Sequence, residues 1–358
     1  MLSPLRIARG IVALVIFGLA LEAWARIDDS LTYGAPLSGA YNSEILYTRD
    51  DLGRIGKPHA RYRKWGLNSL GFRGPELASG KLTILAFGAS ETFGLYEDEG
   101  QEYPRQLEKK INARLGRDAV QVVNAAYPGE SAFTANVRAP GIVDKIHPSV
   151  AIVYPTPADY IWLPYLVPAK HQRSTRGPVR EPFEWRIAER LRTFVKGVLP
   201  GFVQTRLRER ETRAAEAEFA VMDSLPPENV RRFHDDVTNL VTSLKSRGVV
   251  PVVVTHANAF GSGATPENQA QLVAWRKFYP MLREQGFLNM EHRMNDALRA
   301  IAHEQDVALI DVAAVLPANP QTFADFVHFT DHGADLMAGE LANGLTPIVQ
   351  HILTAPPQ

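Results

Sequence analysis

The chain contains, at residues 82–94, the segment Leu82-Thr83-Ile84-Leu85-Ala86-Phe87-Gly88-Ala89-Ser90-Glu91-Thr92-Phe93-Gly94. Its first six residues form a mostly apolar run that ends at Gly88, which is typical of a buried strand in a parallel sheet. A helical pattern follows at Tyr103–Leu115, so Ser90 is predicted to lie in a strand-to-helix turn. In open α/β sheets ligands bind at the carboxyl ends of the strands, which makes this turn a suitable place for a nucleophilic hydroxyl.

A second informative segment, Asp325-Phe326-Val327-His328-Phe329-Thr330, lies near the end of the chain. A serine alkoxide is not accessible at neutral pH, so Ser90 needs a general base, and that base needs a partner that fixes its tautomer. His328 is the candidate base and Asp325 the candidate orienting carboxylate. Asp311 is the alternative acid, but an Asp at the end of a strand commonly caps the next turn, so we prefer Asp325.

Taken singly, each segment fits an ordinary role, because a glycine-flanked serine occurs in tight turns and a histidine near a helix occurs as a cap. Together, GASETFG and DFVHFTDHG resemble the first and last sequence blocks of the SGNH (GDSL-like) hydrolase superfamily, in that family's order. The resemblance implies a flavodoxin-like three-layer α/β/α sandwich with a five-stranded, mainly parallel sheet. It also implies a serine esterase or acylhydrolase with Ser90, His328 and Asp325 as catalytic residues.

The middle of the chain carries the segments from which such a hydrolase builds its oxyanion hole. After the predicted strand Val120–Asn124, Gly129 lies in a block resembling the one whose glycine donates a backbone N–H, so Ser90 and Gly129 are the candidate donors. After the predicted strand Val150–Tyr154 the family has Gly-x-Asn-Asp, and here Ala158 stands where the asparagine is expected. Loss of one oxyanion donor typically costs about 10²–10³ in rate. Either another donor fills the place, or the enzyme is slow, altered or inactive.

Two more strands complete the predicted sheet, at Val249–Val254 and Val307–Val312. His256 and Asn258 follow the first of them and should open on the same edge of the sheet. We expect one of them to replace the missing oxyanion donor or to bind substrate; the alternative is a capping or loop role. The remaining helices are predicted at Asn229–Arg247, Gln269–Gln285, Glu291–Gln305 and Asp331–Leu345.

The composition is that of a globular chain of 358 residues, 45% hydrophobic and 22% charged, which allows one large core with insertions. Lys plus Arg and Asp plus Glu number 39 each, so the net charge gives no support for a nucleic-acid partner. The absence of cysteine excludes disulfides, thiolate catalysis and Cys-ligated metals. His256 and His292 lack a metal-ligand spacing and there is no dinucleotide or Walker motif, so we expect no cofactor and no metal.

Residues 1–26 are predicted to be a signal anchor or a signal peptide. Arg6 and Arg9 precede the apolar run Ile11–Ala25, and basic residues on that side favour a cytoplasmic N-terminus. Ala23-Trp24-Ala25 fits a cleavage site, but the segment is expected to stay as an anchor. The segment Lys64-Trp65-Gly66-Leu67-Asn68-Ser69-Leu70-Gly71-Phe72-Arg73-Gly74-Pro75-Glu76 resembles a leader found before the first strand in membrane-tethered SGNH-like proteins. This resemblance implies a bacterial inner-membrane protein with its catalytic domain in the periplasm or outside the cell; cleavage would give a secreted protein.

Residues 27–80 are rich in Gly, Tyr and Arg, and we expect an arm or hairpin packed on the catalytic domain, residues 81–358. Within that domain, about residues 160–235 exceed what a crossover between two strands needs, so we expect an insertion there. From Lys170 to Arg213 it has twelve Lys or Arg against five Glu, with apolar residues at helical spacing. Basic amphipathic helices of this kind act as lids, at membrane surfaces or in protein contacts, and all three roles stay open.

The sequence therefore predicts a serine ester hydrolase that acts outside the cytoplasm on O-acyl esters, with acetyl or other short acyl groups. One alternative is an O-acyltransferase of cell-envelope glycans, in which a sugar hydroxyl replaces water. The other is a non-catalytic SGNH-like binding or scaffold protein, motivated by Ala158 and the basic insertion. The expected partners are the ester substrate, a glycan acetyl ester or small acyl ester, and a membrane through the N-terminal segment. The sequence identifies no protein partner.

Overall fold

The computed structural model describes residues 4–162, 184–198, 221–261, 263–265 and 268–355, with the single positions 203, 206, 210 and 213. At its centre is a five-stranded sheet, ordered β6-β5-β7-β8-β9, in which every pairing is parallel. The strands are β5 (Leu82–Phe87), β6 (Val120–Asn124), β7 (Val150–Val153), β8 (Val250–Val254) and β9 (Ala308–Ile310). This is the strand order of flavodoxin-like folds, so the predicted fold class is confirmed.

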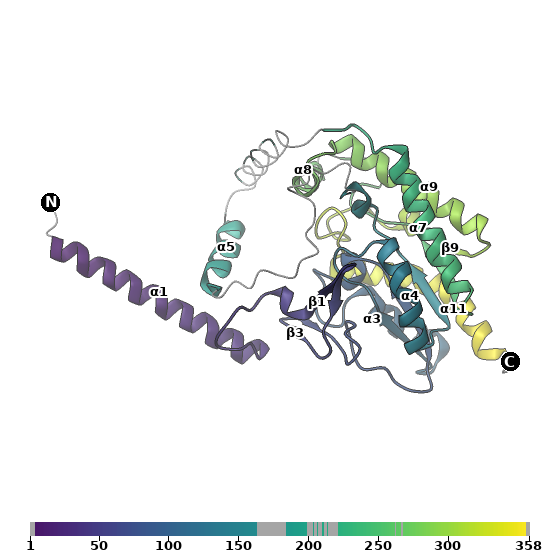
Figure 1. Ribbon diagram of the computed structural model, residues 1–358, viewed down its shortest axis with the longest axis horizontal. Coiled ribbons are helices and arrows are strands. Elements are labelled where there is room, and N and C mark those ends of the chain that lie inside the picture. Colours follow the sequence, from purple (N-terminus) through teal and green to yellow (C-terminus); the bar gives the residue numbers. More distant parts are fainter. Residues whose placement is uncertain are drawn as a thin grey trace.

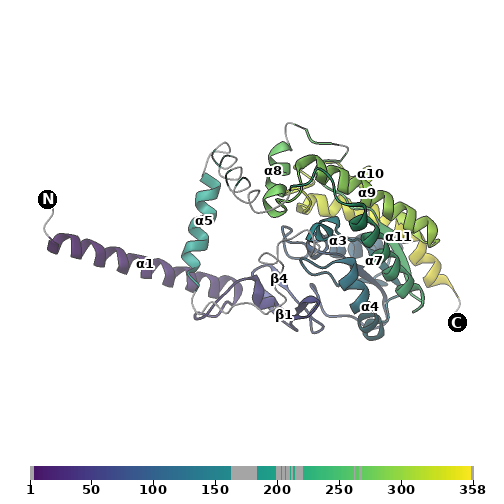
Figure 2. The ribbon, with the colours of Figure 1, turned by 45° about the horizontal axis from the view of Figure 1, so that its top comes forward.

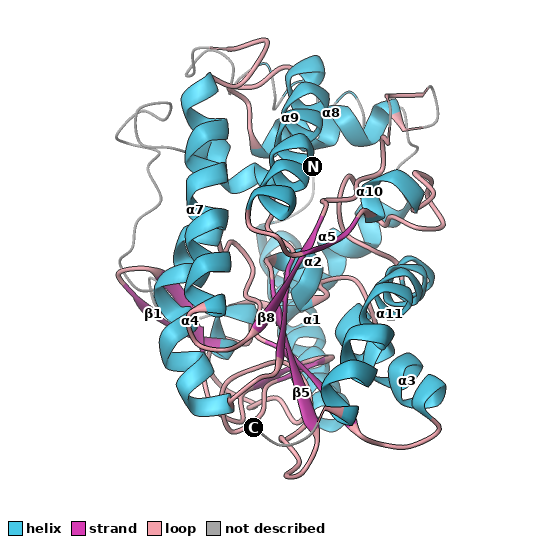
Figure 3. Cartoon of the chain, turned by 90° about the vertical axis from the view of Figure 1, so that its right-hand side faces the viewer, coloured by secondary structure: helices cyan, strands magenta, loops and turns pink. Residues whose placement is uncertain are grey.

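Helices cover both faces of the sheet, which gives three layers. One face carries α3 (Tyr103–Leu115) and α11 (Asp331–Thr354), and the other carries α4 (Ala132–Ile146), α7 (Pro227–Lys245) and α9 (Glu284–Glu304) (Figure 3). Alternate strand residues feed two hydrophobic cores: Ile84 and Ile152 pack under α3 and α11, and Leu85 and Val153 pack on the opposite face. All six residues of β5 are buried, as expected for a central strand of a parallel sheet.

Most predicted elements are found at or near the predicted bounds. β5, β6 and α3 match them, and α7 is displaced by two residues toward the N-terminus. The predicted single helix Gln269–Gln285 is wrong, because α8 (Gln269–Phe278) ends before Pro280 and α9 already begins at Glu284. Pro280 cannot donate a backbone hydrogen bond and keeps the preceding residue out of the helical region. Shorter elements are α2 (Ser90–Phe93), η2 (Pro157–Trp162) and α10 (Val312–Val315).

The segment between the N-terminal helix and β5 folds into small hairpins against the body of the protein. It contains η1 (Ser43–Leu46), β1 (Tyr47–Asp50), β2 (Gly53–Gly56), β3 (Arg61–Tyr62) and β4 (Trp65–Gly66), with β1–β2 and β3–β4 paired antiparallel. Leu46, Tyr62 and Phe72 are buried in the same hydrophobic cluster as one face of the sheet. We call residues 34–80 the arm from here on.

Helix α1 (Pro4–Tyr33) projects away from the body, with the N-terminus at its far end (Figure 1). By length and composition it is apolar enough to cross a membrane, and 6% of its most apolar window is buried. It continues past the predicted boundary at Arg26.

The end of α1 nearest the body contacts α5 (Arg186–Val198), which stands beside it at an angle (Figure 2). Glu22 accepts a hydrogen bond of 3.0 Å from the Ile187 amide, and Asp29 pairs with Arg190 at 2.6 Å. α5 belongs to the predicted basic insertion. Most of the remainder of the basic stretch lies outside the described residues, so its three possible roles stay predictions.

Candidate active site

The candidate nucleophile lies where β5 ends. Ser90 is the first residue of α2, directly beyond the carboxyl end of β5. A Cβ atom at Gly88 would lie 2.0 Å from the Thr92 hydroxyl oxygen, so the turn requires glycine at this position. The short helix ends at Gly94, whose φ of 84° also favours glycine. Local sequence thus forces a sharp turn that leaves Ser90 half-buried at the edge of the sheet.

The structure brings the three predicted triad residues together. His328 Nε2 lies 2.9 Å from Ser90 Oγ, and His328 Nδ1 lies 2.8 Å from Asp325 Oδ2. Asp325 Oδ1 also accepts the backbone N–H groups of Val327 and His328, at 3.0 and 2.9 Å, so the turn itself fixes the carboxylate. With Nδ1–H donating to Asp325, neutral His328 presents Nε2 as the acceptor for the Ser90 proton.

Asp311, the alternative acid, is engaged elsewhere. Its carboxylate pairs with Arg299 at 2.9 Å and accepts the Thr255 hydroxyl at 2.8 Å. It therefore supports the junction of β8, β9 and α9 and does not contact His328.

The electrostatics of the His–Asp pair follow from its burial and its hydrogen bonds. Burial opposes ionisation of Asp325, but the hydrogen bond and charge of His328, with the two backbone amides, keep the pKa of this carboxyl below its usual value. Burial likewise lowers the pKa of His328, but Asp325 outweighs it and the pKa is raised above 6.5, with Glu91 and Glu97 adding in the same direction. Asp325 thus stays ionised while His328 becomes a stronger base.

A pocket of about 290 Å³ opens beside Ser90. Its lining combines the loops after β5, β6 and β7 with the loop that carries His328, and includes Gly129, Ala158, Asp159, Tyr96, Tyr279 and Phe326. Gly129 has a φ of 82°, a conformation that turns its peptide as few other residues can. Among the described residues, the amide N–H groups of Ser90 and Gly129 donate to no protein acceptor. Both predicted oxyanion donors therefore remain available at the pocket.

The structure does not bring His256 or Asn258 into this pocket. His256 is 1% exposed, with Nε2 facing Glu91 at 3.4 Å and Nδ1 facing Glu291 at 2.9 Å. Asn258 Oδ1 accepts the backbone N–H groups of Phe260 and Gly261, at 2.9 and 3.2 Å, which is the loop role that was the alternative. Ala158 does line the pocket, and no side-chain amide is found among its described lining residues.

Two residues of the site were missed from the sequence. Glu91, next to the nucleophile, is buried, and its Oε2 lies 3.3 Å from Ser90 Oγ. The sequence did offer an indication of this role, because a charged residue directly after the serine at a strand end is unusual in an otherwise apolar turn. Tyr96 lines the same pocket, and its ring lies 5.3 Å from that of His328. No spacing in the sequence indicates this contact.

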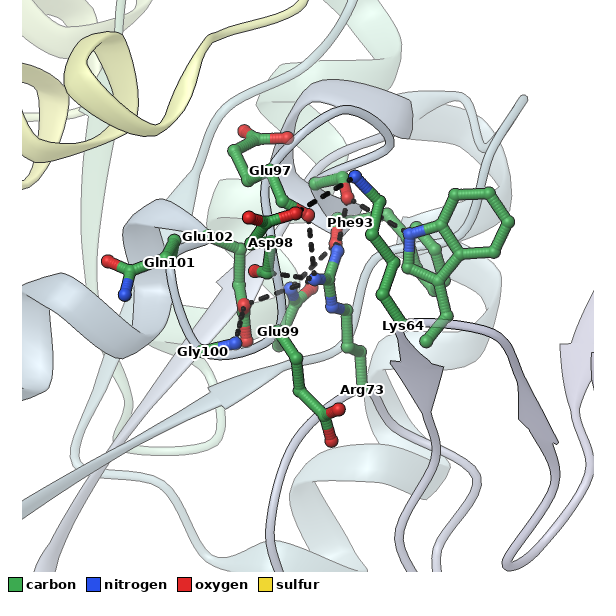
Figure 4. A network of polar contacts seen from close by, with 12 residues as sticks. Lys64, Arg73, Phe93, Glu97, Asp98, Glu99, Gly100, Gln101 and Glu102 are labelled. Carbon is green, nitrogen blue, oxygen red and sulfur yellow. Dashed lines mark hydrogen bonds and ion pairs between the residues drawn. The ribbon is translucent and has the colours of Figure 1, made fainter. Parts of the chain in front are cut away.

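The arm reaches the site through Arg73. Its buried guanidinium donates to the backbone carbonyls of Phe93, at 2.6 Å, and Gly94, and pairs with Glu102 at 3.2 Å. Figure 4 shows the Arg73 side chain entering the loop between Phe93 and Glu102. Because this loop carries Tyr96, the arm helps to fix the wall of the pocket next to His328.

Within the described residues, no group of three or more His, Cys, Asp or Glu side chains is placed to hold a metal ion. The arrangement of Ser90, His328 and Asp325 needs none for acyl transfer.

No protein-family profile matches the chain, and no curated protein matches it. Solved structures do resemble it. A lipase/acylhydrolase from Enterococcus faecalis is 13% identical with a TM-score of 0.45, over 75% of this chain and 96% of that one. A catalytic mutant of an acetylxylan esterase from Geobacillus stearothermophilus is 12% identical with a TM-score of 0.44, over 75% and 95%. A GDSL-like lipase from Bacteroides thetaiotaomicron is 10% identical with a TM-score of 0.40, over 75% and 88%. All three matches have at most 13% sequence identity and a TM-score below 0.5.

Proposed function

We propose that this chain is a serine ester hydrolase of the SGNH (GDSL-like) type. The observation that carries the proposal is the continuous hydrogen-bond chain from Ser90 through His328 to Asp325 at the edge of a pocket. A nucleophile, a base within hydrogen-bond reach and a group that orients the base are the components that acyl transfer requires.

The reaction proceeds in two steps. Ser90 Oγ attacks the ester carbonyl while His328 Nε2 takes the Ser90 proton, and the amides of Ser90 and Gly129 bind the oxyanion. The carbonyl re-forms as the bond to the alcohol breaks, and His328 gives its proton to the departing alkoxide. His328 then takes a proton from water as the water oxygen attacks the acyl-serine. When the bond to Ser90 Oγ breaks, His328 gives this proton to Ser90 Oγ, which releases the acid and restores the free enzyme.

Short acyl esters, such as acetyl esters, fit the site best. A pocket of about 290 Å³ lies just below the range of roughly 300–1,000 Å³ that is usual for small-molecule sites. Tyr279 and Phe326 provide an apolar wall, while Asp159 gives the lining a polar residue. This combination favours a small acyl group on a polar alcohol, as in acetylated glycans.

α1 is proposed to be a membrane anchor, with the hydrolase domain outside the cytoplasm. Arg6 and Arg9 lie on the N-terminal side of the apolar segment, which favours a cytoplasmic N-terminus. The helix is long enough to cross a bilayer and stands clear of the body (Figure 1). A substrate in the cell envelope would be consistent with this placement.

The test uses the full chain in detergent with p-nitrophenyl acetate, butyrate and octanoate as substrates. Ser90→Ala and His328→Ala should each reduce turnover by at least about 10³-fold, whereas Ser69→Ala, on the exposed arm, should have no effect. We expect acetate to be the preferred ester. An inactive wild type, or activity retained in Ser90→Ala, would overturn the proposal. Product formation that depends on an added sugar acceptor would instead identify an O-acyltransferase.

A further inference from the structure

A buried row of ionisable side chains leads from the nucleophile into the core and is separate from the triad. Glu91 Oε2 lies 3.3 Å from Ser90 Oγ, and Glu91 Oε1 lies 3.4 Å from His256 Nε2. On its other side, His256 Nδ1 lies 2.9 Å from Glu291 Oε2 of α9. Glu91, His256 and Glu291 are all buried. Burying charged groups is costly unless they are paired, so this row needs a physical reason.

The row is held rigidly by its neighbours. The Thr156 hydroxyl donates to Glu91 Oε1 at 3.1 Å, and the ring of Tyr154 stacks on His256 with centroids 5.4 Å apart. The Asn295 side chain accepts from the His256 amide at 2.7 Å and donates to its carbonyl at 2.9 Å. Three elements, the ends of β7 and β8 and helix α9, therefore fix where the Glu91 carboxylate lies.

The charges in the row are also defined. Burial opposes ionisation of Glu91, yet the hydrogen bond and charge of His256 lower its pKa to about 2. Burial likewise lowers the pKa of His256, but Glu291 and then Glu91 outweigh it and raise this pKa to about 10. At neutral pH a carboxylate thus lies beside Ser90, with an imidazolium directly behind it.

We propose that Glu91 is a positioning residue of the hydrolase: its fixed carboxylate is a second acceptor for the Ser90 hydroxyl and a second anion facing His328. The inference rests on the proposed function and adds to it a charge that the triad does not contain. His256 and Glu291 are the buried support that holds this carboxylate in place.

The effect of Glu91 follows from the proton positions. When His328 is neutral, Ser90 O–H donates to Nε2. When His328 is protonated, Nε2–H donates to Ser90 Oγ, and the serine hydroxyl turns to Glu91 Oε2. The same imidazolium forms during attack, when the proton moves from Ser90 Oγ to Nε2. A nearby anion favours the charged form of His328 in both cases.

The other ionisable groups that face His328 allow Glu91 to be separated from them. They are Asp325 on the same loop, and Glu97 and Tyr96 on the loop after α2. Burial raises the pKa of Glu97 to about 7, so this carboxyl carries only part of its charge at the pH where His328 gains its proton. Glu97→Gln therefore serves as a graded comparison, which should move the His328 midpoint in the same direction as Glu91→Gln but by less.

The experiment measures, against pH, the rate at which a fluorophosphonate labels the full chain and kcat/KM for p-nitrophenyl acetate. Glu91→Gln should move the acid limb of both profiles to lower pH by about 0.5–1 unit and reduce the plateau rate by roughly 3–10-fold. Glu91→Asp, which keeps the charge, should retain the wild-type midpoint, whereas Glu97→Gln should lower it by less than Glu91→Gln does. Glu291→Gln, remote from Ser90, should move the midpoint in the same direction as Glu91→Gln but by less.

An unchanged midpoint in folded Glu91→Gln would overturn the inference and leave Glu91 a structural residue. A wild type that neither reacts with the fluorophosphonate nor hydrolyses the ester would instead overturn the proposed function. NMR titration of the labelled His328 ring reports the same shift without turnover, so the inference can be judged even in that case.

Discussion

The guanidinium of Arg73 lies 3.2 Å from the carboxylate of Glu102, and the side chain of each is 2% exposed. This contact joins the arm to the residue that precedes α3. Another pair, Arg61 and Glu99, also links the arm to the same loop at 2.6 Å, but its side chains are 50% and 57% exposed. The two pairs have the same chemistry and differ in burial.

Arg73→Met should therefore lower the free energy of unfolding by about 3–5 kcal/mol, because it leaves a buried carboxylate and backbone carbonyls without their partner. Arg61→Met should cost less than about 1 kcal/mol, since water replaces the lost partner. Denaturant unfolding followed by tryptophan fluorescence measures both. Similar losses in the two variants would show that burial of the Arg73 pair is not what matters.

The raised pKa of His328 predicts the acid limb of the reaction. His328 must be neutral to act as a base, and its pKa is raised above 6.5, so kcat/KM should fall as the pH drops through a midpoint above 6.5. Asp325→Asn removes the main cause and should lower the midpoint while reducing kcat by about 10³–10⁴-fold. Asp311→Asn is the control and should leave the midpoint in place. A midpoint that moves in Asp311→Asn would reassign the triad acid.

The raised pKa of the buried Glu130 carboxyl implies that the free energy of unfolding declines toward alkaline pH. Arg138 approaches it to 3.6 Å but is paired more closely with Asp50, at 2.7 Å, so burial prevails and raises the pKa of Glu130 to about 8. The folded state keeps this proton up to about pH 8, whereas the unfolded chain loses it near 4.5. The stability that the buried, protonated Glu130 contributes is therefore fully present below pH 4.5 and is lost as the pH rises through 8.

Glu130→Gln should accordingly flatten the fall in unfolding free energy between pH 5 and 8. Denaturation curves of wild type and variant at several pH values make the comparison. Parallel curves for the two proteins would assign the decline to other groups.

A donor side chain introduced at position 158 should increase esterase activity. It lines the pocket with Ser90 and Gly129, at the position where the resembled family has an oxyanion-binding asparagine. Ala158→Asn should raise kcat for p-nitrophenyl acetate by about tenfold, which is less than the 10²–10³ that an evolved donor contributes. Ala158→Leu, which branches at the same carbon as asparagine but has no donor, should lower kcat. Equal losses in both variants would mean that this position lies away from the developing charge.

The sequence predicted the sheet well because its central strands are buried on both faces and read as continuous apolar runs. Leu82–Phe87 and Val120–Asn124 have their predicted bounds for this reason. The helix break at Pro280 was also readable from the sequence, and the prediction of a continuous helix overlooked it.

The site was predictable only in its local parts. Asp325 and His328 lie in one turn, and Ser90 follows a clear strand, so their roles could be proposed from short segments. The contacts of Glu91 with His256 and of Arg73 with Glu102 join positions that are distant in the sequence or depend on how the arm packs. No periodicity encodes such contacts, and His256 was accordingly expected in the pocket although it lies behind it.

The contact between α1 and α5 bears on maturation of the protein. Ala25, the last residue of the possible signal-peptidase motif, is fully buried inside a continuous helix, whereas proteolysis favours exposed and locally mobile chain. Cutting there would also carry away Glu22, which accepts the amide of Ile187 near the start of α5. A processed form would begin with only the last eight residues of α1, Arg26–Tyr33, and would leave the Ile187 amide without this acceptor. The C-terminal part of α1 therefore also supports the start of α5.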